Sequence, residues 1–152
     1  MTVKETLEEY NLFDQCIVRH GSTENNARDY QLIGLLTGAD FHLEVEYIFK
    51  GCIKIDYKIQ VVPKGFSMDD RFLDLKSQDD PNLPHAFFWC VGADVYPGWT
   101  LEEDTKELQD LGKTYGGLKF YKITFDTNTY LLSLIFHDIA IGKTKRIEKN
   151  AV

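Results

Sequence analysis

The chain of 152 residues has the length of one domain, which can bury a core without disulfide or metal staples. Its net charge of −7 argues against binding to nucleic acid or an anionic membrane and suits a basic partner. No apolar run approaches the ~20 residues of a membrane span, and the polar, acidic start lacks the apolar region of a signal peptide. We therefore expect a cytoplasmic protein.

The first half of the chain reads as strands. Residues 1–10 are expected to form a short helical turn or to fray, and residues 12–20 and 29–38 are predicted strands. In residues 41–50 and 53–62 apolar side chains alternate with polar ones, which is the period of half-buried strands. These last two segments are predicted to form a hairpin.

The register of that hairpin follows from its apolar face. A three-residue loop would pair Phe49 with Ile53 and Tyr47 with Ile55, so that apolar side chains share one side. A two-residue turn would set Tyr47 against Lys54, an apolar residue against a polar one. The buried face therefore selects the longer loop.

One helix is predicted, over residues 101–111. Thr100 is a good N-cap, and Glu103 three residues later completes a capping box. Gly112 is a natural C-terminal cap. Residues 85–95, which precede the predicted helix, are apolar on both faces, as in a central strand.

A second hairpin is predicted from residues 118–125 and 130–141. Its tip would set Phe125 opposite Tyr130, and the basic tail from residue 143 onward is expected to fray. The strands come in antiparallel pairs and do not alternate with helices, which disfavours a Rossmann or barrel fold.

The predicted fold class is therefore α+β and β-rich. We expect a twisted antiparallel sheet or sandwich of about seven strands, with one main helix over residues 101–111 packed against it. The whole chain, residues 1–152, is predicted to be a single domain with frayed ends over residues 1–10 and 143–152.

Motifs for catalysis, metals and nucleotides are absent from the sequence. No nucleophile elbow, phosphate-binding loop, dinucleotide fingerprint or paired-histidine zinc motif is present, so no cofactor and no metal are expected. The three cysteines, Cys16, Cys52 and Cys90, are widely spaced and are read as free thiols of a reducing compartment.

Two adjacent residues, His137 and Asp138, are the most suggestive catalytic pair. Neighbours on a strand point to opposite faces, so these two side chains are not expected to touch. An enzyme of unknown type that uses His137, Asp138 or Cys90 is kept as a third hypothesis, and the sequence favours a protein that is not an enzyme.

Acidic and aromatic residues supply the candidate binding surface. The acid-rich stretch of residues 69–80, the turn at residues 96–99 and the acidic residues that follow could form one docking surface for a basic protein. Trp99 is the better surface aromatic, and Trp89 is expected to be buried. The candidate partner-binding residues are Asp69, Asp70, Asp74, Tyr96, Trp99, Glu102 and Glu103.

This profile of a small, acidic, β-rich chain without catalytic motifs resembles that of bacterial immunity proteins. It implies a non-catalytic protein-binding module that neutralises a basic toxin or nuclease. The alternative is a small-ligand-binding domain with an aromatic-lined cavity, because the chain has ten Phe and eight Tyr.

Overall fold

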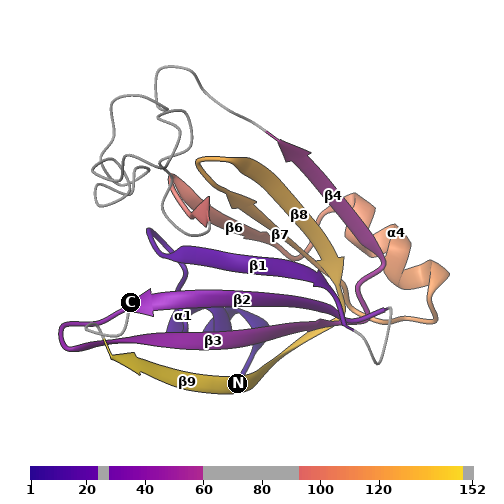
Figure 1. Ribbon diagram of the computed structural model, residues 1–152. Helices are drawn as coiled ribbons and strands as arrows, with labels where there is room; N and C mark the ends of the chain where they lie inside the picture. Colours follow the sequence, from indigo (N-terminus) through magenta and orange to yellow (C-terminus); the bar gives the residue numbers. More distant parts are fainter. Residues whose placement is uncertain (24–27, 60–92, 149–152) are drawn as a thin grey trace.

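Two antiparallel sheets form the body of the protein. The structure, a computed structural model, describes residues 1–23, 28–59 and 93–148, and Figure 1 shows the two sheets as facing layers. The first sheet has the order β5 (Ala93–Asp94), β1 (Cys16–Ser22), β2 (Tyr30–Thr37), β3 (Phe41–Lys50) and β9 (Asp138–Glu148). The second has the order β4 (Lys54–Ile59), β8 (Tyr130–Phe136), β7 (Tyr121–Asp126) and β6 (Gly98–Glu102).

Helix α1 spans Val3–Glu9, and helix α4 spans Lys106–Thr114 (Figure 1). The β-rich α+β class with two antiparallel layers and few helices confirms the predicted fold class. The predicted strand over residues 29–38 is confirmed as β2. The predicted strand over residues 85–95 lies outside the described residues except for its last part, which contains β5.

The predicted hairpin between residues 41–50 and 53–62 is wrong. β3 pairs with β2 and β9, whereas β4 crosses to the other sheet and pairs with β8. The chain turns this corner at Gly51, whose φ of +60° favours glycine. The Cys52 amide donates to the Arg28 carbonyl at 2.6 Å, which ties the corner to the start of β2.

A second corner joins β8 to β9. His137 separates the two strands, and its amide donates to the Lys50 carbonyl at 2.9 Å beside the first corner. The apolar run predicted as one strand over residues 130–141 therefore serves both sheets in turn. The two corners join the sheets at one end of the sandwich, as Figure 1 shows.

The register of the β7–β8 hairpin also differs from the prediction. Phe125 lies opposite Leu132 and not opposite Tyr130. The tip of the turn lies one residue further along the chain than predicted, at residues 128–129. Thr127 faces Tyr130 there: its amide donates to the Tyr130 carbonyl at 3.0 Å, and its hydroxyl accepts a hydrogen bond from the Tyr130 amide at 2.9 Å.

Of the two alternatives for residues 1–10, a helical turn or a frayed end, the structure has the helix, and residues 143–148, predicted to fray, belong to β9. Thr2 and Glu5 form a reciprocal capping box at the start of α1. At the other end, β9 pairs with β3 as far as Glu148, and the Arg146 guanidinium lies 4.0 Å above the Phe41 ring.

The helix begins later than predicted. Thr100 lies in β6 opposite Thr124, and the N-cap is Thr105, whose hydroxyl accepts a hydrogen bond from the Leu108 amide at 3.3 Å. Gly112 is buried inside α4 and does not cap it. Pairing of β6 with β7 therefore overrides the capping signal at Thr100.

The main core fills the space between the sheets. Phe49 on β3 packs edge-on against Phe125 and Phe136 of the facing sheet, with ring centroids 6.3 and 4.9 Å away. Two residues of α1, Val3 and Leu7, join the same cluster. A smaller cluster lies under α4 and contains Leu108, Phe120 and Ile135.

Candidate functional site

Two exposed aromatic rings lie side by side: Tyr96, in the segment before β6, and Phe13, in the segment before β1. Tyr96 is 45% exposed and Phe13 is 52% exposed, and their ring centroids are 6.4 Å apart. Gly98, with a φ of +144°, lets Phe13 approach the backbone, because a Cβ at that position would lie 3.1 Å from the Phe13 ring. We call this pair the Phe13–Tyr96 surface.

Trp99 is linked to this surface through the side chain of Asn11. The Trp99 indole nitrogen donates to the Asn11 side-chain oxygen at 2.9 Å, and the same oxygen accepts the Phe13 amide at 2.8 Å. The Trp99 ring is half-buried and packs against the main core. Trp99 therefore ties the loop that carries Phe13 to the edge strand β6.

Phe13 was missed at the sequence level. It falls inside a segment predicted as a strand, where an aromatic residue reads as core. In the structure, Asp14 adopts a φ of +55°, and the chain turns there before β1 begins at Cys16. That turn carries the Phe13 ring to the exterior.

The acidic candidates Glu102 and Glu103 lie at the far end of β6 from Tyr96. The strand is five residues long, which is roughly 16 Å at the usual strand rise. Glu102 is exposed and lies opposite Lys122 on β7. Glu103 forms an ion pair with Lys119 at 3.7 Å, so the lysine partly neutralises the negative charge of this carboxylate. The other acidic candidates, Asp69, Asp70 and Asp74, lie outside the described residues.

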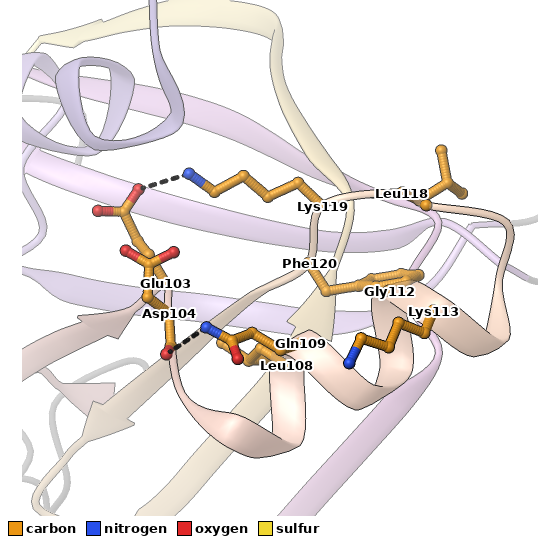
Figure 2. Close-up of a pocket in the computed structure, with 10 residues that line it drawn as sticks. Glu103, Asp104, Leu108, Gln109, Gly112, Lys113, Leu118, Lys119 and Phe120 are labelled. Atoms are coloured by element: carbon orange, nitrogen blue, oxygen red, sulfur yellow. Dashed lines mark hydrogen bonds and ion pairs between the residues drawn. The ribbon is translucent and has the colours of Figure 1, made fainter.

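A hollow of about 380 Å³ lies between the end of β6, α4 and the segment before β7. Figure 2 shows Glu103 reaching Lys119 across it, and Gln109 of the helix bonding the Asp104 carbonyl. Lys113 also lines it. Both signs of charge are present, so the described part of this helix start is a mixed surface and not a uniformly acidic one.

A second cavity, of about 350 Å³, lies at the corner between the sheets. Its wall is aromatic: Tyr115 packs edge-on against Phe120, which in turn packs edge-on against His137. His137 Nδ1 lies 2.8 Å from the Lys119 carbonyl. Because a carbonyl only accepts, Nδ1 carries the proton, and in the neutral ring Nε2 is left as an acceptor. The other lining residues are Arg28, Gly51, Cys52, Ile53 and Leu118.

The chemistry of this cavity disfavours a cysteine nucleophile. Burial raises the pKa of the Cys52 thiol to about 11, so the thiol is protonated at neutral pH, and it lies 3.6 Å from the Lys54 carbonyl. The side chains of His137 and Asp138 bond different backbone groups: His137 bonds the Lys119 carbonyl, and Asp138 accepts a hydrogen bond from the Ile139 amide. Cys90 lies outside the described residues.

A cluster of His20 with three tyrosines bridges the two sheets. The His20 ring lies 5.1–5.8 Å, centroid to centroid, from Tyr30, Tyr57 and Tyr130, and its Nδ1 bonds the Tyr30 hydroxyl. Burial lowers the pKa of His20, and it raises the pKa of Tyr30 to about 12. Burial therefore favours the uncharged form of both His20 and Tyr30.

Comparison with known families places the chain. A family described as YxiG-like protein matches residues 1–150. The chain belongs to the YxiG-like family. No curated protein matches it.

The family match spans every described strand and helix of this YxiG-like chain, and the family's description specifies no ligand, partner or reaction. Among the described residues, no three histidine, cysteine or acidic side chains lie together as a metal site would require. In the described residues, neither α1 nor α4 is long and apolar enough to span a membrane.

Proposed function

We propose that this YxiG-like chain is a non-catalytic protein-binding module of the cytoplasm that neutralises a basic partner, in the manner of an immunity or inhibitor protein. The observation that carries the proposal is the Phe13–Tyr96 surface beside the edge strand β6. Aromatic rings that are held rigidly and left exposed are common anchors of protein interfaces, because they bury large areas at little entropic cost.

The edge strand adds a second means of recognition. Within the described residues β6 pairs only with β7, so its other edge presents backbone donors and acceptors beside the aromatic pair. The net charge of −7 and the exposed Glu102 favour a basic partner, whose approach such a field accelerates. Asp69, Asp70 and Asp74 remain proposed contributors to that field.

The test is capture of the partner from native lysate at low salt by the tagged chain and by two variants. The variant Phe13→Ala/Tyr96→Ala removes the proposed anchors. Tyr115→Ala removes an equally exposed tyrosine at the end of α4 and serves as the matched control. We expect the wild type and Tyr115→Ala to retain one stoichiometric basic protein that rising salt releases, and the double variant to lose it. Equal retention by all three chains would refute the proposed surface.

A second candidate is the binding of a small ligand in the cavity at the corner. Its volume of about 350 Å³ lies in the range of small-molecule sites, and its wall of Tyr115, Phe120 and Leu118 with one acceptor on His137 suits a planar apolar molecule with a single donor. Thermal-shift screening of small aromatic amides and phenols would test it. Stabilisation of the wild type that disappears in Tyr115→Ala is the expected result, and no stabilisation by any such compound would count against this candidate.

A further inference from the structure

β4 is an exposed strand at the edge of the four-stranded sheet. In the part of the chain that the structure describes, its backbone pairs with β8 alone. All six of its residues are exposed, in contrast to β8 beside it. A free, exposed strand edge is a template for another strand.

The two faces of β4 differ in chemistry. Ile55, Tyr57 and Ile59 lie on the side that faces the other sheet, yet they are 43%, 51% and 69% exposed. The opposite face carries charged side chains, Lys54, Asp56 and Lys58. An incoming strand must therefore match an apolar face and a charged face in one register.

A second copy of β4 meets both demands. In an antiparallel pair centred on Tyr57, each Ile55 lies opposite Ile59 of the other copy, and each Asp56 lies opposite Lys58. Centring the pair on Asp56 would instead oppose two aspartates. The charges thus select one register, and in that register the strand is complementary to itself.

We propose that β4 pairs with β4 of a second copy about a two-fold axis through Tyr57, which joins the two four-stranded sheets into one continuous sheet. A two-fold contact uses the same patch on both copies and closes at a dimer. Two six-residue strands bury less than the roughly 800 Å² per partner of a standard interface. The dimer is therefore weak and depends on concentration.

This dimer leaves the proposed partner surface free. β4 and β6 are the opposite edges of the same sheet, in the order β4-β8-β7-β6. Loss of the dimer and loss of partner capture are consequently separate outcomes, produced by different substitutions.

Sedimentation equilibrium of the full chain, from micromolar to millimolar concentration at low salt, tests the proposal. We expect a monomer–dimer equilibrium for the wild type. Asp56→Lys sets lysine against Lys58, Lys58→Asp sets aspartate against Asp56, and each is expected to raise the dimer Kd about tenfold. The exchange Asp56→Lys/Lys58→Asp restores opposite charges and is expected to recover the wild-type Kd.

Matched controls separate register from net charge. Asp110→Lys and Lys113→Asp make the same charge changes at exposed positions of α4 and are expected to leave the dimer intact. Circular dichroism checks that each variant is folded. A wild type that stays monomeric at millimolar concentration would overturn the proposal, as would a dimer that the single β4 variants do not weaken or that the exchange does not restore.

Discussion

The Tyr47 hydroxyl donates a hydrogen bond to the Tyr10 carbonyl at 2.6 Å, from the buried face of β3 to the end of α1. The Tyr47 ring is fully buried, and burial raises the pKa of its hydroxyl, so it remains a donor at any ordinary pH. This bond secures the N-terminal helix to the five-stranded sheet.

Tyr47→Phe is therefore expected to lower the free energy of unfolding by about 1–3 kcal/mol, because the Tyr10 carbonyl loses its partner while the ring packing is kept. Urea denaturation measures the change. Hydrogen exchange of the α1 amides should rise in the same variant. Unchanged stability together with unchanged exchange would show that the bond does not hold the helix.

The true start of α4 can be tested with two threonines. Thr105→Ala removes the N-cap acceptor and is expected to cost about 1 kcal/mol of unfolding free energy. Thr100→Ala changes an exposed strand position and should cost less. The reverse order of the two losses in urea denaturation would favour a helix that begins at residue 101.

Gly112 is a helix residue at which alanine should destabilise the fold. Alanine is normally the better helix former by about 1 kcal/mol. Here its Cβ would lie 2.6 Å from the Leu118 carbonyl oxygen, which is backbone and cannot turn aside. We expect Gly112→Ala to lower the melting temperature and Lys113→Ala, at the exposed neighbouring position, to leave it nearly unchanged. A raised melting temperature for Gly112→Ala would contradict the close approach.

The pKa of His20 makes stability depend on pH. Burial lowers this pKa in the folded protein, so as pH falls below about 6.5 the unfolded chain binds a proton that the folded chain resists. The free energy of unfolding should therefore decline as pH falls from 7 to 5. His20→Phe should flatten this decline, whereas Tyr30→Phe, which keeps the buried imidazole, should retain it. Equal slopes for His20→Phe and the wild type would assign the dependence to other groups.

Periodicity predicted which side chains of β3 are buried, but it did not predict that the apolar side chains of β4 stay exposed or which strands are neighbours. Val45, Tyr47 and Phe49 were placed on the buried side of their strand, and all three are fully buried. Alternation along one strand is the same whether its neighbour is a hairpin partner or a strand distant in sequence. The crossings near Gly51 and His137 depend on contacts between distant segments, which local spacing does not encode.

The same limit applies to the candidate site. Tyr96 is exposed, which a turn with proline and glycine favours. Trp99 is half-buried because it packs against the main core, and its indole N–H donates a hydrogen bond to Asn11, which is distant in sequence. Phe13 joined the surface only through the turn at Asp14. The partner strand of β6 decided where the helix starts, although Thr100 and Thr105 are both suitable caps.

The most direct test of the proposed function is hydrogen–deuterium exchange of the full chain, alone and saturated with the basic protein that it captures. The account predicts slowed exchange at the backbone amides of residues 12–15 and 98–102, which carry the Phe13–Tyr96 surface and β6. Protection confined to residues 51–54 and 115–120, around the corner cavity, would contradict it, as would a bound partner that protects neither region.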